Sequence, residues 1–460
     1  MLDLLNQIDA IVWGPWLLVL LVGTGVYLTI RLRLLQMVKL PRALRLIFFA
    51  RNKGDGDIDS FKALCTALAA TVGTGNIVGV ATAIKLGGPG ALFWMWVAAF
   101  FGMATKYAEG CLAVKFRSID ENGNIAGGPM YYIEQGLGKK WKPLALAFAF
   151  FGTLTAMLGS GTTTQVNAIT SSLQASMGVP ILPSAAVITI LVAIITFGGL
   201  KSISKTADKI VPAMAVLYFI ITVALLVIFS GELPHALALV FDGAFEGTAA
   251  AGGFAGAGIM LAMRSGIARG LFSNESGLGS APIVAAAAKT KWPAEQGLIS
   301  MTGTFIDTII ICTLTGLTII VSGAWLGDTN GAALTQAAFS HGYGAVAPIL
   351  LTVSLTLFAF TTILGWNYYG ERCLVYLVGV KGITPYRLCY VAIIAGSAFM
   401  QLEEIWALAD IVNGLMAIPN LIALLGLTGV VVAETKRYFQ HLAIRDAKLV
   451  AYKARHIGKK

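Results

Sequence analysis

The sequence predicts an all-α integral membrane protein with eleven transmembrane helices, two of them discontinuous. The chain of 460 residues is 57% hydrophobic and 12% charged, which is about half the charged fraction of a soluble domain. Several apolar segments exceed the ~20 residues needed to cross the hydrocarbon core of a bilayer. Two of these segments are interrupted by glycine and polar residues. The spans use nearly all of the chain, so no large soluble domain is expected.

The predicted spans are separated by turns rich in proline and glycine or by charged loops. They cover residues 10–32, 60–85, 89–114, 143–177, 181–200, 209–230, 258–288, 295–322, 345–370, 385–401 and 404–433. Residues 1–59 form an extra N-terminal span with a basic cytoplasmic loop, residues 60–434 a ten-helix core, and residues 435–460 a basic cytoplasmic tail.

Basic residues alternate with acidic ones in successive loops. The loop at 31–53 is rich in Lys and Arg, whereas residues 231–249 and 323–344 contain acidic residues and neither Lys nor Arg. Because basic loops remain in the cytoplasm, the N-terminus is expected outside the cell membrane and the C-terminus inside. The net charge of +10 then follows from topology, and no nucleic-acid partner is expected.

Residues 71–76, in the middle of the second span, read Thr-Val-Gly-Thr-Gly-Asn. Two glycines and an asparagine break a helix at a depth where lipid offers no hydrogen bonds. Such a break persists only where it is buried in protein or lines a cavity. It frees C=O groups for cations and N–H groups for anions. The first break therefore predicts an ion site and a substrate site of a secondary transporter.

A second break lies at residues 270–279, which read Gly-Leu-Phe-Ser-Asn-Glu-Ser-Gly-Leu-Gly. Without the first span, each break opens a group of five spans. An odd number of spans per group places the two groups in opposite orientation. Paired breaks in inverted halves mark a transporter binding site, so a 5+5 inverted repeat is predicted.

Other functional classes fit less well. Residues 71–75 are similar to a potassium filter, but they lack its tyrosine and occur once where a filter needs four copies. Ser276 could be considered as a nucleophile, but a nucleophilic serine needs a base beside it. No histidine lies within a predicted span and no lysine is adjacent to Ser276 in the sequence, so an enzyme is not predicted. The five cysteines are scattered and indicate neither a metal site nor a disulfide framework. No cofactor and no obligatory protein partner are expected. The lipid bilayer is the expected surrounding of the protein.

Three segments resemble the signatures of the alanine or glycine:cation symporters, the sodium:alanine symporter family. They are residues 71–81 (Thr-Val-Gly-Thr-Gly-Asn-Ile-Val-Gly-Val-Ala), 127–132 (Gly-Gly-Pro-Met-Tyr-Tyr) and 272–279. The resemblance covers residues 10–435. It implies the leucine-transporter fold, inward Na⁺ movement coupled to uptake of a small neutral amino acid such as alanine or glycine, and alternating access. Coupling to H⁺ remains the alternative.

The break frees backbone carbonyls just before Gly73, among them those of Ala69, Thr71 and Val72, and hard cations take such oxygen ligands. On span 345–370, the Phe358 carbonyl and two threonine hydroxyls share one helix face by their i, i+3 and i+4 spacing. Similarity to the more distant neurotransmitter:sodium symporters implies one Na⁺ held by Ala69, Val72, Phe358, Thr361 and Thr362. A second cation is expected near Thr71 and Asn76. The alternative is that both hydroxyls bond back to their own helix.

The substrate site is predicted where half-helix N-termini present free N–H groups, which favour a carboxylate. Glycine at 73 implies that the substrate brings this carboxylate, since distant relatives that take amines carry an aspartate there. The second break would receive the ammonium group, and bulky side chains would limit substrate size. The predicted residues are Gly73, Thr74, Gly75, Gln165, Phe272, Ser273, Asn274 and Trp366. Ordinary helix packing or interhelical hydrogen bonding is the alternative for the larger side chains.

Ionisable residues within spans are costly and usually paired or functional. Lys106 and Glu109 are three residues apart on a helix and are expected to neutralise each other. Asp307 lies mid-span, where it would shape the cation field or take a proton. Arg269 and Asp410 are expected to form an outer gate.

Overall fold

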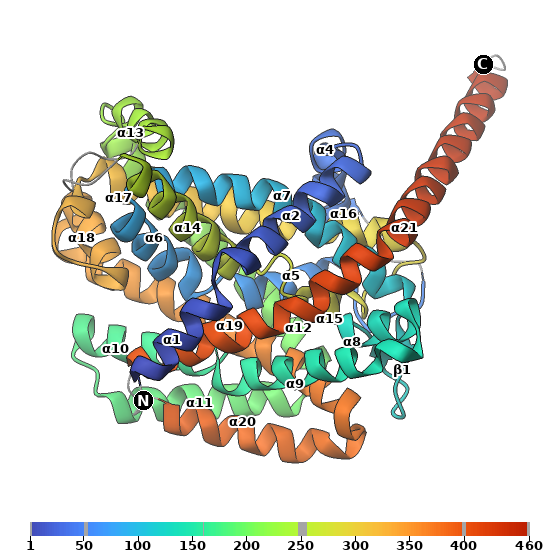
Figure 1. Cartoon of the computed structure of the whole chain (residues 1–460), viewed down its shortest axis with the longest axis horizontal. Coiled ribbons are helices and arrows are strands. Elements are labelled where there is room, and N and C mark those ends of the chain that lie inside the picture. The colour runs from blue at the N-terminus through green and yellow to red at the C-terminus, as the bar shows by residue number, and fades with distance from the viewer. Residues whose placement is uncertain (1, 50–53, 160, 247–254, 398–401, 458–460) are drawn as a thin grey trace.

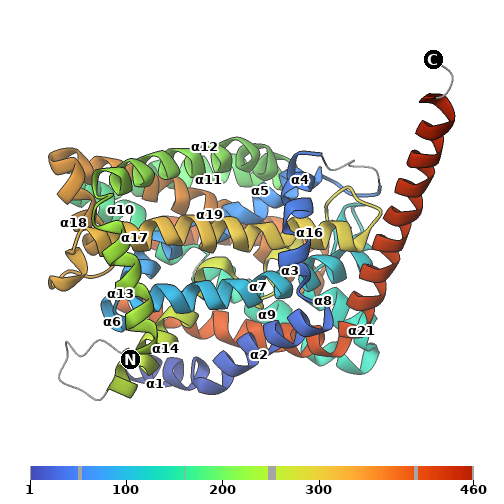
Figure 2. The ribbon, with the colours of Figure 1, turned by 90° about the horizontal axis from the view of Figure 1, so that it is seen from above.

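Long helices lie side by side in the computed structural model, most of them along the horizontal axis of Figures 1 and 2. The structure describes residues 2–49, 54–159, 161–246, 255–397 and 402–457. The only strands in these ranges are β1 (Ser118–Ile119) and β2 (Ile125–Ala126), which pair antiparallel. The prediction of an all-α protein therefore holds apart from this one hairpin.

Fourteen α-helices precede the second break among the described residues. They are α1 (Leu2–Val12), α2 (Pro15–Arg31), α3 (Leu35–Val38), α4 (Leu40–Phe49), α5 (Ser60–Thr71), α6 (Val80–Gly87), α7 (Gly90–Lys115), α8 (Pro129–Tyr132), α9 (Lys142–Leu158), α10 (Thr163–Met177), α11 (Ile181–Phe197), α12 (Gly199–Ile228), α13 (Leu233–Phe245) and α14 (Ala255–Asn274). The helices after it are α15 (Ala281–Ala285), α16 (Pro293–Thr304), α17 (Thr313–Val321), α18 (Gly331–Tyr343), α19 (Ala347–Val378), α20 (Ile383–Ser397) and α21 (Leu402–Ile457).

Six helical stretches among the described residues are long and apolar enough to cross a membrane, and the bent pair α5 and α6 makes a seventh. Length and composition thus establish fewer spans than the eleven predicted. Helices α7 and α14 are long but carry ionisable residues, while α11 and α20 have only 17 and 15 residues. Residues 398–401 of the predicted span 385–401 lie outside the described residues. The eleven spans and the inverted repeat stay predictions.

Two of the predicted spans contain a break between helices, although Leu2–Arg31 and Lys139–Met177 each still count as one apolar stretch. The first is interrupted before Pro15, which takes the first position of α2, where its missing N–H group costs nothing. The span predicted at 143–177 is two helices, α9 and α10, because Gly159 and the polar residues after it end the first helix. A single 35-residue helix would also exceed the ~20 residues that a bilayer requires. Residue 160 in this segment is not among the described residues.

Two predicted cytoplasmic segments are more helical than expected. The basic loop after the first span contains α3 and α4, although its residues 50–53 lie outside the described part. Helix α21 runs through the predicted boundary at 434 and continues to Ile457, where the described chain ends. Its far end and helix α1 lie at opposite ends of the bundle in both views (Figures 1 and 2).

The two breaks lie in the middle of the bundle, surrounded by its longest helices (Figure 1). Helix α7 packs against α14 and α16, and α5 packs against α12 and α19. Large side chains of these helices, such as Tyr107, Tyr218 and Trp366, are fully buried. This packing keeps lipid away from the free backbone groups of both breaks.

Candidate functional site

The first break separates α5 from the π-helical segment Gly75–Gly79 that leads into α6, and the two halves are bent by 53°. Val72 has an extended backbone with φ −79° and ψ 92°. The Gly73 N–H donates to Oδ1 of Asn76 at 2.9 Å, so the helical ladder is interrupted at the predicted place. Val72, Thr74 and Asn76 are almost fully buried.

Oxygen atoms from α5 and α19 meet beside this break. The hydroxyl of Thr362 lies 3.4 Å from the Val72 carbonyl oxygen and 3.0 Å from the Phe358 carbonyl oxygen. The hydroxyl of Thr361 is also 3.0 Å from the Phe358 carbonyl. Ala69, one turn before Val72, is fully buried. The structure thus brings three of the predicted Na⁺ ligands together, namely the carbonyls of Val72 and Phe358 and the hydroxyl of Thr362. It also contains the contacts of both hydroxyls to their own helix that were named as the alternative.

Gly73 faces this oxygen cluster. A Cβ atom at this position would lie 2.5 Å from the Thr362 hydroxyl oxygen and 3.3 Å from Oε1 of Gln165. Both separations are shorter than an ordinary van der Waals contact. The position therefore requires glycine for a steric reason as well as the electrostatic one argued from the sequence.

Gln165 of α10 accepts a hydrogen bond from the Thr74 N–H group, which was predicted to bind a carboxylate. Its Oε1 accepts from the Thr74 N–H at 3.3 Å, and its Nε2 donates to the Thr74 hydroxyl at 3.0 Å. The carboxamide oxygen stands where an anionic oxygen would stand. Thr71 and Asn76, predicted around a second cation, are engaged elsewhere: the Thr71 hydroxyl lies 3.2 Å from the Ala67 carbonyl oxygen of its own helix.

The second break follows α14. Glu275, Gly277 and Gly279 all have positive φ, at 55°, 91° and 83°. A positive φ is uncommon for glutamate, and the two glycines permit the turns that separate α14 from α15. The side chain of Asn274 stabilises the turn, since its Oδ1 accepts from the Ser276 N–H at 2.9 Å.

Trp366 supports the second break. Its indole donates to the Glu275 carboxylate at 2.9 Å, and Ser280 donates to the other carboxylate oxygen. The indole packs on Gly161, where an added Cβ would lie 2.5 Å from the Trp366 Cβ. The structure therefore gives Trp366 a positioning contact with Glu275 that sequence reasoning did not anticipate.

Asp307 joins the two breaks. It lies in the π-helical segment Phe305–Cys312 between α16 and α17 and is fully buried. Its carboxylate accepts from Asn76 of the first break at 2.7 Å and from Ser273 of the second at 3.0 Å. Sequence analysis noted Asp307 as a costly charge in the middle of a span, but did not include it among the predicted substrate or Na⁺ ligands. At Gly75 an added Cβ would lie 3.1 Å from the Ser273 Cα, so the breaks also touch directly.

Glu109 of α7 holds the second break from another side. Its Oε1 accepts from the N–H groups of Gly277 and Gly279 at 3.1 and 3.2 Å and from Asn420 at 2.8 Å. The expected ion pair with Lys106 is not formed. The Lys106 ammonium has no hydrogen-bond partner among the described residues. The turn N–H groups exposed by the break take the carboxylate instead.

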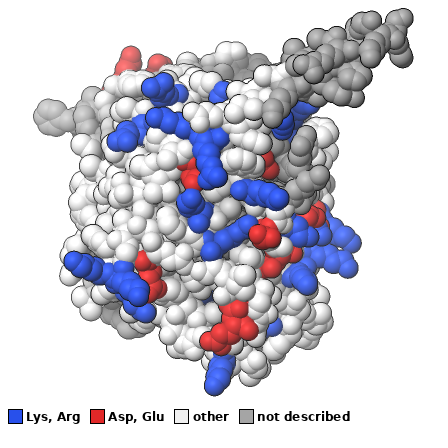
Figure 3. Space-filling model, turned by 90° about the vertical axis from the view of Figure 1, so that its right-hand side faces the viewer, with Lys and Arg blue, Asp and Glu red and all other residues white. Residues whose placement is uncertain are grey.

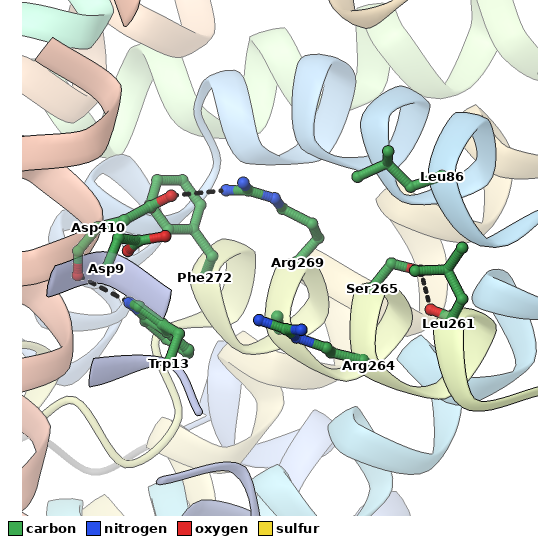
Figure 4. A pocket seen from close by; sticks show the side chains of 10 residues that line it. Asp9, Trp13, Leu86, Leu261, Arg264, Ser265, Arg269, Phe272 and Asp410 are labelled. Carbon is green, nitrogen blue, oxygen red and sulfur yellow. Dashed lines mark hydrogen bonds and ion pairs between the residues drawn. The ribbon is translucent and has the colours of Figure 1, made fainter. Parts of the chain in front are cut away.

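A cavity of about 220 Å³ lies between α1, α14 and α21 on one side of the second break (Figure 4). Arg269 and Asp410 form an ion pair across it at 3.3 Å; their role as a gate stays a prediction. Phe272 lines the cavity next to the second break, with its ring centroid 5.7 Å from the Arg269 guanidinium. Asp9 of the extra helix α1 and Trp13, which directly follows this helix, also line the cavity; sequence reasoning missed both.

A much smaller cavity, of about 20 Å³, lies among α5, α7, α15 and α16. Thr71, Lys106 and Asn274 line it, so it touches the residues just before and at the two breaks. Its volume suffices for about one water molecule. The larger of these two cavities is therefore the one that Phe272 lines.

Comparison with known proteins decides the family. The profile of the sodium:alanine symporter family matches residues 1–451. The chain belongs to this family. It is 49% identical to the sodium/alanine symporter AgcS of Methanococcus maripaludis over 97% of this chain and 99% of that one. An uncharacterized transporter of Haemophilus influenzae is 56% identical, with 96% and 97% covered. The probable sodium/glutamine symporter GlnT of Bacillus subtilis is 41% identical, with 93% and 88% covered.

A solved manganese transporter of Eremococcus coleocola has a similar fold, with a TM-score of 0.50 at 12% identity over 81% of this chain and 78% of that one. At this identity the likeness concerns the fold alone, and it agrees with the leucine-transporter fold implied by the sequence. Membership of the sodium:alanine symporter family confirms the resemblance carried by residues 71–81, 127–132 and 272–279. The protein is a membrane-embedded transporter and not an enzyme.

Proposed function

We propose that this protein is a secondary active symporter that couples inward movement of Na⁺ to uptake of alanine, and of small neutral amino acids such as glycine, by alternating access. Family membership and the 49% identity to a sodium/alanine symporter support the coupling ion and the substrate. The observation that carries the mechanism is the meeting of the Val72 carbonyl and the Thr362 hydroxyl across the first break.

Na⁺ is bound by carbonyl oxygens of Ala69, Val72 and Phe358 and by the hydroxyls of Thr361 and Thr362. A hard cation prefers such a set of neutral oxygens. A threonine hydroxyl that donates to its own helix still offers lone pairs on the same oxygen. Back-bonding to Phe358 therefore orients these hydroxyls and leaves them able to coordinate the ion. For a second cation at Thr71 and Asn76 the support is weaker, because Oδ1 of Asn76 already accepts from Gly73.

The substrate carboxylate binds the N–H groups of Thr74 and Gly75 and displaces the carboxamide of Gln165. Its ammonium group is received by Ser273 and Asn274 of the second break, beside the Asp307 carboxylate that Ser273 already contacts. Gly75 now packs on Ser273, so the two breaks must separate to admit a ligand. That separation is the local movement on which alternating access depends.

Phe272 covers this site from the large cavity, and its ring limits the size of the side chain that fits below it. The substrate range is set here rather than at Trp366, whose indole is turned toward Glu275. Because one relative is named as a probable sodium/glutamine symporter, glutamine is included with alanine and glycine in the test.

The large cavity faces the outside and the small one the cytoplasm, with the N-terminus outside the cell membrane and the C-terminus inside. The concentration of Lys and Arg at the end from which α21 projects supports this orientation. In this arrangement the Arg269–Asp410 pair, which lines the large cavity, serves as the outer gate.

The test is uptake of labelled alanine, glycine and glutamine into proteoliposomes of purified protein. Alanine is expected to accumulate only with an inward Na⁺ gradient, and Thr361→Ala and Thr362→Ala should each raise the Na⁺ concentration for half-maximal uptake. Uptake driven by a pH gradient without Na⁺ would transfer the coupling to H⁺. Ohmic current without substrate would indicate a channel. Absence of uptake under both gradients would refute the proposal.

A further inference from the structure

A third cavity, of about 300 Å³, lies at the end of the bundle from which α21 projects. It is enclosed by α4, the first turn of α16 and the part of α21 beyond residue 434. Arg42 and Arg45 of α4 and Arg445 of α21 line it. Figure 3 shows Lys and Arg side chains gathered over this end of the molecule. None of the residues of the two helix breaks lines this cavity, and the transport mechanism above makes no use of it.

The charge of this cavity is positive and incompletely compensated. Arg445 is paired with Asp446 at 3.1 Å. The one acidic residue in the lining is Glu295, which accepts a hydrogen bond from Tyr438 at 3.2 Å. Arg42 and Arg45 form no ion pair with any described residue; their guanidinium groups lie against aromatic rings at 5.9 and 6.0 Å. Guanidinium groups are suited to bidentate binding of phosphate oxygens.

The surroundings of the cavity are apolar. Leu46, Phe49 and Leu442 complete its lining. Phe48 and Phe49 at the end of α4 are 75% and 71% exposed. A helix that presents arginines on one face and exposed aromatic rings at its end has the pattern of a helix lying in the membrane interface. A soluble anion would use the arginines alone and would leave these rings in water.

We propose that this cavity binds the phosphate of an anionic phospholipid from the adjacent leaflet, which is the cytoplasmic leaflet in the orientation proposed above. The phosphate lies between Arg42, Arg45 and Arg445, and the acyl chains lie along Phe48 and Phe49. Arginines near an anionic membrane surface each strengthen such binding. The lipid thereby ties α4 to α16 and α21, and α4 is the helix that precedes α5 and the first break.

The experiment measures lipid adducts of the detergent-purified full chain by native mass spectrometry during titration with dioleoyl phosphatidylglycerol or dioleoyl phosphatidylcholine. We expect one phosphatidylglycerol to bind more tightly than the others and phosphatidylcholine to give no such adduct. The double variant Arg42→Gln/Arg45→Gln should weaken this adduct about tenfold to thirtyfold, at about 1 kcal/mol per arginine.

The matched control is Lys139→Gln/Lys140→Gln, which removes two exposed basic residues that do not line the cavity. It should leave the tight adduct unchanged. Equal weakening in both double variants would mean general surface attraction and would overturn the proposal. So would displacement of the lipid by millimolar inorganic phosphate, which would show a site for a soluble anion. Equal melting temperatures for both variants and wild type exclude unfolding as the cause, and Arg445→Gln provides an independent second variant.

Discussion

Replacing Gly73 by alanine tests whether the oxygen cluster between α5 and α19 is the Na⁺ site. The new Cβ would lie 2.5 Å from the Thr362 hydroxyl oxygen, which would have to retreat by about 0.9 Å to reach an ordinary contact of 3.4 Å. Overpacking of this kind costs about 1–3 kcal/mol. If the cost falls on the Na⁺-bound state, the Na⁺ concentration for half-maximal alanine uptake should rise about 5-fold to 150-fold.

Gly79→Ala is the matched control. Gly79 belongs to the π-helical segment that follows the same break, its φ and ψ are helical at −63° and −44°, and nothing lies within 4 Å of an added Cβ. This variant should keep the wild-type Na⁺ dependence. The assay is alanine uptake into proteoliposomes over a range of Na⁺ concentrations, together with the increase in melting temperature that Na⁺ produces in detergent, since a ligand stabilises the state that binds it.

A double variant separates the clash from a general loss of stability. Thr362→Ala removes the oxygen atom that Gly73→Ala would strike, so the two effects share one contact and should not add. Gly73→Ala/Thr362→Ala should therefore be no worse than Thr362→Ala alone. A wild-type Na⁺ dependence in Gly73→Ala, or fully additive losses in the double variant, would refute the reasoning.

Three further predictions concern the contacts around the breaks. Asp410→Asn and Arg269→Gln should each slow uptake severalfold, because the ion pair contributes about 1 kcal/mol; exchanging the two charges should restore uptake, and independent losses without rescue would count against a gate. Glu109→Leu should lower the melting temperature by several degrees, since it leaves two backbone N–H groups of the second break without an acceptor at about 1–3 kcal/mol each; Glu109→Gln should lie between it and wild type, and equal melting temperatures would contradict this. Arg117 donates to three backbone carbonyls in the segment after α15 at 2.9 to 3.1 Å, so Arg117→Gln should speed trypsin cleavage of this segment. An unchanged cleavage rate would show that these hydrogen bonds do not hold the segment in place.

The two breaks were accessible to sequence reasoning because their cause is local. Glycines and an asparagine in an apolar span interrupt a helix wherever it packs, and α5 and α14 end as this requires. The i, i+4 spacing also places the Thr362 hydroxyl and the Phe358 carbonyl on one face. Beyond the breaks, Arg269 and Asp410 could be paired because each is a costly charge in a span that needs a partner.

The remainder depends on contacts between segments distant in sequence. Asn76 was expected to bind a cation, but its amide donates to Asp307, 231 residues away. No sequence pattern reveals the π-helical turn that carries Asp307 or the turn N–H groups that draw Glu109 away from Lys106. The contribution of Trp13 to the large cavity was missed for the same reason, since its indole reaches the backbone carbonyl of Asp410 only through tertiary packing.

Helix α21 connects three sites that lie at different heights of the helix bundle. It carries Asp410 in the large cavity, Asn420 at the second break and Arg445 in the cavity that Arg42 and Arg45 also line. At 1.5 Å per residue, the first and last of these are separated by about 50 Å of continuous helix. Because the helix is continuous, a rotation about its own axis would displace all three contacts together. Pro419, which lies within the helix between Asp410 and Arg445, removes one backbone hydrogen bond. Any bend of α21 is therefore expected at this residue, where it would move Asp410 relative to Arg445.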